Sequence, residues 1–145
     1  MDHSRSDEPQ DPRPIVVTGA SGFVGRHVVT ALKASGVRFV CGTRDPERQR
    51  ERDPSVLWRR IDLEEPETVR PALEGCRALV HLVHQIDAGS DYPEREERGA
   101  RCIAEAAAAA DLDRVVFLGG PDPGPNGSKH LHSRLRSGEL LRQGD

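Results

Sequence analysis

Aromatic residues and long apolar runs are scarce in this sequence. Phe, Trp and Tyr together make up 3% of the 145 residues, and the single tyrosine is Tyr92. No apolar stretch reaches the roughly 20 residues that a membrane-spanning helix needs. The N-terminal residues also lack the apolar core of a signal peptide. The sequence therefore predicts no membrane segment and no secretory leader.

Cysteine is also sparse, and its spacing argues against a metal site. Cys41, Cys76 and Cys102 are odd in number and far apart, which fits neither a zinc site nor a disulfide framework. Such thiols are typically buried and reduced in a cytoplasmic protein. His81 and His84 are three apart in an expected strand and should point to opposite faces. We therefore predict no metal ion.

No excess of basic residues is present. The formal net charge is −3, with 21 Lys and Arg against 24 Asp and Glu. The two signs are interspersed, so no basic face indicates nucleic-acid binding. The length suits one domain. Residues 1–13 are polar and rich in turn formers, which predicts a disordered tail before a folded domain over 14–145.

Apolar stretches alternate with helical ones along the chain. Strands that are apolar on both faces and alternate with helices predict a parallel sheet covered on both sides. Right-handed crossovers then give a three-layer, doubly wound α/β fold of about five strands in the order 3-2-1-4-5. The expected strands are 14–19, 37–42, 55–63, 78–84 and 114–120. The expected helices are 22–35, 66–75, 91–113 and 129–142, with a short helix or a loop over 44–54.

Apolar residues at helical spacing predict which face of each long helix is buried. The first helix should end at Gly36, since glycine commonly follows a helix C-terminus. The expected stripes are Val24, Val28, Ala31 and Leu32; Ile103, Ala106, Ala107 and Ala110; and Leu131, Leu135 and Leu141.

Three glycines, Gly19, Gly22 and Gly25, separate the first strand from the first helix. One permits a tight turn, another lets the backbone approach a pyrophosphate, and the third lets the helix pack on the strand. The phosphates would bind free N–H groups at the positive end of the helix. A mononucleotide P-loop is excluded, because Arg26 and His27 stand where Lys and Ser or Thr are required. The spacing predicts dinucleotide binding.

Arg44 follows the second expected strand, where the ribose of a dinucleotide is recognised. An acidic residue there binds the ribose hydroxyls and repels a 2′-phosphate, whereas arginine pairs with that phosphate. Arg26 could assist from the helix start. Asp45 is adjacent, and a shift of one residue would reverse the preference. We predict NADP(H) over NAD(H), with a solvated surface arginine as the alternative.

Four segments carry a family resemblance: "TGASGFVGRHV" (18–28), "IDL" (61–63), "VHLVH" (80–84) and "RVVFLGG" (114–120). The chain resembles the short-chain dehydrogenase/reductase superfamily, in particular its NmrA-like and extended, epimerase/dehydratase-like members. This implies a Rossmann domain that binds adenine at Asp62 and Leu63, and the nicotinamide ribose near the end of strand four. The implied cofactor residues are Gly19, Ser21, Gly22, Phe23, Val24, Gly25, Arg44, Asp62, Leu63, Leu82, Val83 and His84.

The catalytic motif of that family, Y-x-x-x-K, is absent. Aligning Ser133 and Arg134 with its usual Ser-Lys pair puts His130 at the tyrosine position and Arg134 at the lysine position. Histidine can act as an acid or base near neutral pH, but Arg134 would oppose its protonation. The other interpretation is a surface helix with basic residues. We assign no catalytic residue.

The resemblance also implies a sixth strand and a substrate-binding region beyond the last helix, and the sequence ends before them. We therefore expect a cofactor-binding domain that lacks the usual catalysis. An active NADP-dependent oxidoreductase or epimerase/dehydratase-like enzyme, or a fragment of one, remains the alternative. Strand five would be an exposed edge that a second copy could cover, giving a homo-oligomer.

Overall fold

Five parallel strands form one sheet in the order β3-β2-β1-β4-β5, which confirms the predicted topology. Each strand is shorter than its apolar stretch suggested, because the apolar stretch continues beyond the residues that form hydrogen bonds with a neighbouring strand. The strands are β1 Ile15–Thr18, β2 Phe39–Thr43, β3 Trp58–Arg60, β4 Ala78–His81 and β5 Arg114–Phe117.

The computed structural model describes residues 11–84, 89 and 91–143. Most of the tail predicted over 1–13, namely residues 1–10, lies outside the described residues. Asp11 and Arg13, by contrast, form an ion pair, and Arg13 also reaches Asp113 next to β5. The end of the predicted tail is therefore held against the start of a strand.

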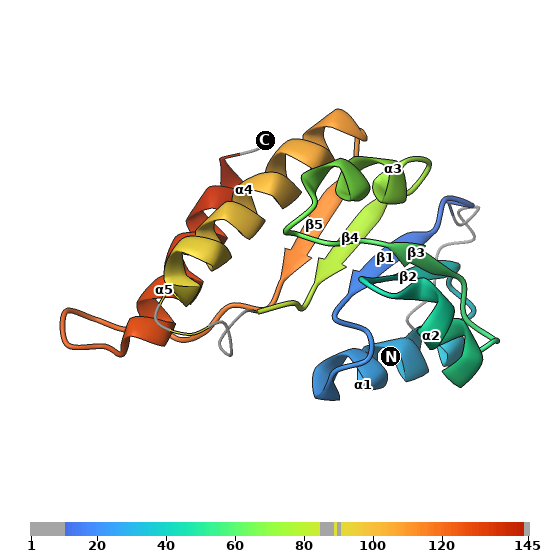
Figure 1. Ribbon diagram of the computed structural model, residues 1–145, viewed down its shortest axis with the longest axis horizontal. Coiled ribbons are helices and arrows are strands. Elements are labelled where there is room, and N and C mark those ends of the chain that lie inside the picture. Colours follow the sequence, from blue (N-terminus) through green and yellow to red (C-terminus); the bar gives the residue numbers. More distant parts are fainter. Residues whose placement is uncertain (1–10, 85–88, 90, 144–145) are drawn as a thin grey trace, which may run out of the picture.

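Helices cover the sheet on both sides, as the alternating pattern predicted. α1 lies on one side of the sheet, and α3, α4 and α5 lie on the other (Figure 1). No helix among the described residues has the length and apolar character needed to cross a membrane. The helices are α1 Phe23–Ser35, α2 Pro46–Arg52, the 3₁₀ turn η1 Pro66–Thr68, α3 Val69–Leu73, α4 Tyr92–Ala109 and α5 Lys129–Arg142.

Successive residues of β1 supply the two halves of the core. Val16 and Val17 are both fully buried and point to opposite faces of the sheet. Val16 packs with α3 and α4, including Leu73 and Ile103. Val17 packs with Val29 of α1, Cys41 of β2 and Trp58 of β3. Both faces of the central strand are therefore apolar, as a doubly wound sheet requires.

The buried face of α1 agrees with the predicted stripe only in part, since Val28 and Leu32 pack against the core. Gly25 and Val29 are buried, whereas Val24 is 41% exposed and Ala31 is also exposed. The helix ends at Gly36 as predicted. The periodicity was misleading because the contact nearest the turn is made by a glycine, which has no side chain to mark it.

The prediction for α5 holds only in part: Leu141 packs against the core and Leu131 is half-buried, but neither is among the fully buried residues. Its buried residues are Ser133, Arg134, Ser137 and Leu140, while Leu135 is 42% exposed. Arg134 is 6% exposed, so the interpretation of a basic surface helix does not hold for this residue. A buried ion pair replaces apolar contacts, and an apolar pattern cannot reveal it. The predicted stripe of α4 at Ile103, Ala106 and Ala107 is confirmed.

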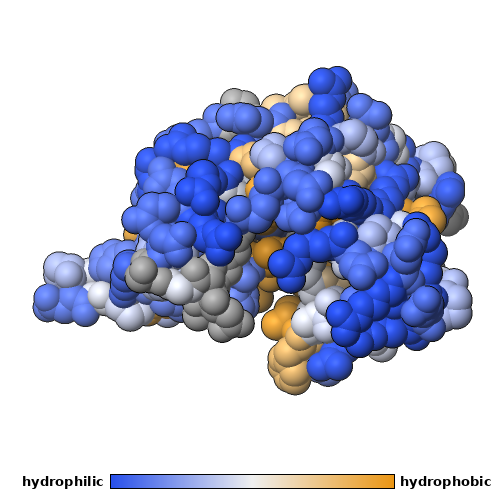
Figure 2. Space-filling view, viewed as in Figure 1, coloured by the Kyte–Doolittle hydropathy of each residue, from blue (hydrophilic) through white to orange (hydrophobic). Residues whose placement is uncertain are grey.

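β5 forms one edge of the described sheet. Val116 and, just past the strand, Leu118 are each 48% exposed. The face of the molecule shown in Figure 2 is mainly hydrophilic, with a small hydrophobic area beside a hollow at its lower edge. The sheet is therefore well covered at its centre and open at β5.

Candidate functional site

A cavity of about 560 Å³ opens at the carboxyl ends of the parallel strands, where doubly wound folds bind their ligands. Its volume lies within the range of small-molecule and cofactor sites. It combines residues from the ends of β1, β2 and β4 with residues that follow β3. Seven predicted cofactor residues line it: Gly19, Ser21, Arg44, Asp62, Leu63, Val83 and His84.

The remaining predicted residues lie around the cavity rather than in its wall. They are Gly22, Phe23, Val24, Gly25 and Leu82. Leu82 is half-buried and packs with the α1-side core. Sequence reasoning also missed lining residues: Thr18, Gly42, Thr43, Asp45, Arg48, Gln49, Ile61, Glu64, His81 and Arg95.

Two glycines of the turn are required by its geometry. Gly19 has φ +70°, and a Cβ there would lie 3.0 Å from the Leu82 carbonyl carbon and 3.1 Å from the Val83 nitrogen. A Cβ on Gly25 would lie 2.1 Å from the Gly19 oxygen. The turn therefore packs directly against the end of β4, and α1 packs directly against the turn.

The start of α1 offers unpaired main-chain donors. Gly22 is the N-cap, and it has no side chain that could accept a hydrogen bond from the first turn. The first N–H groups of a helix lack partners within it and carry its positive end. Phe23 and Val24 are 75% and 41% exposed, respectively, so any part they play in anion binding falls to their main chain. That part stays a prediction.

Arg44 lies beside the first turn of α2 at one end of the cavity. The neighbouring Asp45 accepts a hydrogen bond from the Arg48 main-chain nitrogen at 3.0 Å and so caps α2. Arg48, one turn into the helix, lines the same cavity. The sequence contained a signal for Arg48, because Asp followed by Pro46 is typical of a helix start.

Asp62 is held by contacts within its own loop. Its Oδ1 accepts from the Glu64 nitrogen at 3.0 Å, and its main-chain nitrogen donates to Thr68 Oγ1 at 2.9 Å. Glu64 in turn forms an ion pair with Arg95 of α4, with 3.4 Å between Oε1 and Nε. Because Glu64 and Arg95 also line the cavity, this pair connects the loop after β3 with α4 at its border.

His81 ends β4 and contributes to the cavity wall. Its Nδ1 shares a hydrogen bond of 2.8 Å with Thr18 Oγ1 of β1, and its ring stacks on Phe117. Burial, with a smaller contribution from the charge of Arg134, lowers the pKa of His81 to about 4. The ring is therefore uncharged at neutral pH.

The positions aligned with the missing catalytic motif lie one turn apart on α5, and Tyr92 lies on another helix. Arg134 Nη1 pairs with Glu96 Oε2 at 3.2 Å, and both side chains are 6% exposed. His130 lies one turn earlier in α5 and is half-buried. Tyr92 begins α4, where the Lys129 ammonium lies 5.5 Å from its ring centroid. The guanidinium of Arg134, which stands at the lysine position, is thus bound by a buried carboxylate of the protein itself.

Neither metal ligands nor reactive thiols gather within the part of the chain that the structure describes. No group of three or more His, Cys, Asp or Glu side chains is placed to hold a metal ion there. Cys41 and Cys76 are buried and Cys102 is half-buried, and all three are free. Burial raises the pKa of each thiol, that of Cys41 to about 12.

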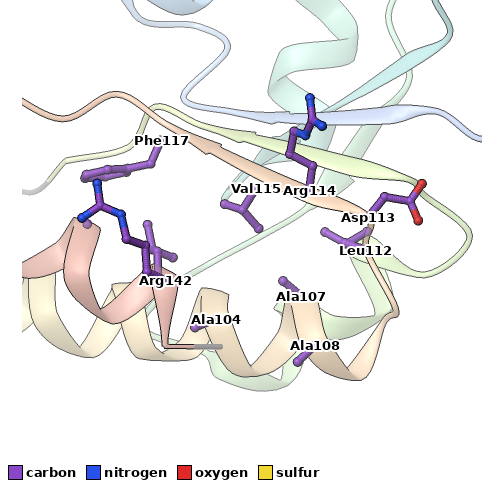
Figure 3. Close-up of a pocket in the computed structure, with 11 residues that line it drawn as sticks. Ala104, Ala107, Ala108, Leu112, Asp113, Arg114, Val115, Phe117 and Arg142 are labelled. Atoms are coloured by element: carbon purple, nitrogen blue, oxygen red, sulfur yellow. The ribbon is translucent and has the colours of Figure 1, made fainter. Parts of the chain in front are cut away.

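A second cavity, of about 320 Å³, lies between β5 and the helices α4 and α5 (Figure 3). Small side chains of α4, such as Ala104 and Ala107, leave room opposite Val115 and Phe117 of β5. This cavity includes none of the predicted cofactor residues. The larger cavity at the strand ends is therefore the candidate site.

Comparison with known proteins agrees with this geometry. A family model described as NAD(P)H-binding matches residues 19–139. A ceramide reductase from Caulobacter vibrioides is 32% identical over 139 residues, which cover 93% of this chain and 44% of that protein.

Solved structures show the same fold. The Citrobacter sp. triphenylmethane reductase complexed with NADP(H) matches with a TM-score of 0.75 and 21% identity, over 90% of this chain and 46% of that one. A short-chain dehydrogenase/reductase superfamily protein from Agrobacterium tumefaciens with bound NAD gives a TM-score of 0.73 and 25% identity, over 90% and 44%. The chain thus spans less than half the length of each of these three proteins.

Proposed function

The chain belongs to the NAD(P)H-binding family, as a Rossmann domain of the extended short-chain dehydrogenase/reductase type, and on that premise we propose that it binds NADP(H) in preference to NAD(H). One observation carries the proposal. The glycine turn and two arginines, Arg44 and Arg48, border a single cavity at the carboxyl edge of the sheet. This arrangement provides separate anchors for the pyrophosphate and for a phosphate on the adenosine ribose.

In the proposed binding mode, the pyrophosphate lies over the turn at Gly19 and the first N–H groups of α1. Adenine lies beside Asp62 and Leu63, and the nicotinamide half extends toward Leu82, Val83 and His84. The close approach of Gly19 to Val83 supports this order, because it brings the wall at β4 next to the phosphate site. Bound cofactor would supply or accept a hydride at the nicotinamide end.

The preference for NADP(H) rests on the charge around the adenosine ribose. Arg44 and Arg48 line the cavity there, and a guanidinium pairs well with a phosphate. Asp45 is the acid that could oppose a 2′-phosphate, but one of its oxygens accepts the Arg48 main-chain N–H that caps α2. Asp45 also lines the cavity, but its Oδ1 is engaged in the cap, and its single charge faces two guanidinium groups, which supports the arginines as phosphate ligands.

Calorimetric titration with NADPH and NADH tests the preference. Arg44→Gln and Arg48→Gln should each weaken NADPH binding by about tenfold or more, the loss expected for a charged hydrogen bond, while NADH binding changes little. Arg50→Gln is the matched control, since Arg50 lies in the same helix but not in the cavity wall. Equal losses for both cofactors would remove the 2′-phosphate role, and a folded chain that binds neither would refute the proposal.

Hydride transfer is a second candidate function. It is favoured by the reductase names of two proteins to which the chain is similar, whereas the engagement of Arg134 with Glu96 speaks against the family's usual Tyr-Lys chemistry. NADPH oxidation with a panel of simple aldehydes and ketones distinguishes the two functions. Turnover that exceeds the rate without protein would favour an enzyme. Tight binding without turnover would favour a cofactor-binding domain.

A further inference from the structure

The guanidinium of Arg134 is enclosed by four groups from three different elements. Beside the ion pair with Glu96 of α4, it donates to the carbonyl oxygen of Val83 at 3.5 Å and to that of Leu118. Its Cζ lies 4.3 Å from the centroid of the Phe117 ring. Side chain and carbonyls therefore converge on one buried cation, which is a costly arrangement unless each partner is kept in place.

The two carbonyl groups belong to strand ends that the sheet does not hold. Val83 and Leu118 follow His81 and Phe117, the last paired residues of β4 and β5. A main-chain carbonyl beyond the ladder needs another donor when it is screened from water. Arg134 supplies that donor to both strand ends at once, so its position fixes the path of the chain after β4.

The peptide at Val83 connects this network to the candidate cofactor site. Val83 lines the larger cavity. Its main-chain nitrogen is so close to Gly19 that a Cβ added to this glycine would lie 3.1 Å from it. Arg134 holds the carbonyl of the same residue. Movement of the guanidinium would thus be transmitted over a single residue to the cavity wall beside the glycine turn.

We infer that Arg134, held by Glu96, is a positioning residue that sets the wall of the nicotinamide half of the cofactor site. The inference rests on the proposed binding of NADP(H). In the proposed binding mode, Arg134 does not contact the cofactor and acts through Val83. The adenosine half, bordered by Arg44, Arg48 and Asp62, is built from other strands and does not depend on it.

This division gives a test that a purely structural role would not satisfy. Affinities for NADPH and for adenosine 2′,5′-bisphosphate, which lacks the nicotinamide half, are measured by calorimetry in the whole chain. Arg134→Lys keeps the charge but cannot reach a carboxylate and two carbonyls together. We expect it to weaken NADPH binding by about tenfold, because about 1.4 kcal/mol of the binding free energy would be needed to restore the wall at Val83, and to change bisphosphate binding by less than about twofold.

Glu96→Gln is a second, milder variant, because it keeps the side-chain length and one acceptor oxygen. It should show the same selective loss to a smaller extent. Arg136→Lys is the control: Arg136 lies on the same helix, is 45% exposed and pairs with Glu97 and Glu139, so neither affinity should change.

The outcomes separate the inference from its premise. Equal losses for NADPH and the bisphosphate would show a general effect on the fold and overturn the positioning role. Unchanged NADPH affinity in both variants would overturn it as well. If the unmodified chain binds the bisphosphate but not NADPH, the nicotinamide half of the site is wrong. If it binds neither, the proposed function itself fails.

Discussion

Arginines at the two ends of one sheet edge have opposite environments. Arg44 and Arg48, beside β2, are exposed and border the cavity, whereas Arg134, beside β4 and β5, is 6% exposed and surrounded by protein acceptors. The same functional group is thus available to a ligand at one end and engaged by the fold at the other. Burial and partners, rather than residue type, decide which function an arginine can serve.

The largest expected effect concerns the end that carries the glycine turn. In Gly25→Ala, the new Cβ would lie 2.1 Å from the Gly19 oxygen and 2.6 Å from the Ala20 Cα. Because these neighbours are main-chain atoms, the cost should exceed the approximately 1–3 kcal/mol of ordinary overpacking. We expect loss of dinucleotide binding together with a lower unfolding midpoint in urea.

Gly138→Ala in α5 is the matched control at the other end. Its Cβ would lie 3.6 Å from the Phe117 ring, which is an ordinary contact. In a helix interior, alanine is more favourable than glycine by about 1 kcal/mol. This variant should be as stable as the unmodified chain or more so. If both substitutions changed stability equally, the turn would not have the close packing on which the binding mode depends.

The next largest effect tests the buried arginine. Arg134→Met leaves the Glu96 carboxylate in a buried position without this cation, and removal of one partner of a buried pair costs about 3–5 kcal/mol. Arg136→Met, which removes an exposed pair on the same helix, should cost about 0–1 kcal/mol. Urea unfolding measures both free energies of unfolding.

The double variant Arg134→Met with Glu96→Leu sharpens this result. Replacing both members of a buried pair by apolar groups is often neutral, so the double variant should regain most of the stability lost in Arg134→Met. It would still lack the hydrogen bond to the Val83 carbonyl and should therefore still bind NADPH more weakly. A double variant as unstable as the single one would place the loss in the two carbonyl contacts instead of in the ion pair.

The sequence predicted those features that depend on local chemistry. Strand order, the glycine turn and the end of α1 at Gly36 follow from spacing and residue type, and the structure agrees. The buried faces of α1 and α5 followed only in part. Gly25 packs by having no side chain, and Arg134 is buried because Glu96, 38 positions earlier, meets it in space. Periodicity of apolar residues carries no information about either contact.

The same reason explains which residues of the cavity wall the sequence indicated. Motif residues such as Gly19, Arg44 and Asp62 line the cavity because family motifs occur at strand ends. Thr18, His81 and Arg95 were missed. His81 and Thr18 belong to neighbouring strands and meet only when β1 and β4 pair. Sequence reasoning thus indicated single positions in the cavity wall, but not the pairs of residues that meet there; the cofactor roles of these positions stay predictions.

A smaller effect follows from the buried histidine. The pKa of His81 is about 4 in the folded chain against an ordinary 6.5, so below pH 6.5 the unfolded chain binds a proton that the folded chain does not. The contribution of His81 to the free energy of unfolding is therefore fully present above pH 6.5. It is lost as the pH falls toward 4, and the total loss is on the order of 3 kcal/mol. Urea unfolding between pH 7 and pH 4 measures this slope.

His81→Gln isolates this contribution from that of exposed carboxylates such as Asp53 and Glu97, whose pKa values are lowered by hydrogen bonds and which also weaken the fold in acid. The difference between the two pH profiles should be confined to the range between pH 6.5 and pH 4. Parallel profiles would mean that His81 binds its proton as readily in the folded chain as in the unfolded one, and that neither burial nor Arg134 lowers its pKa.

The smallest effect extends the rule of burial to the cysteines. Burial, with the charge of Asp53 as a smaller contribution, raises the pKa of Cys41 to about 12, so almost no thiolate is present at pH 8. Iodoacetamide should label the folded chain slowly at that pH, and the half-buried Cys102 first. Mass spectrometry of peptides after timed labelling gives the order. Rapid labelling of Cys41 under conditions where the chain is folded would show that the α1 side of the sheet opens. Burial on that side would then not protect a side chain from reagents, whereas burial of Arg134 keeps its guanidinium from ligands.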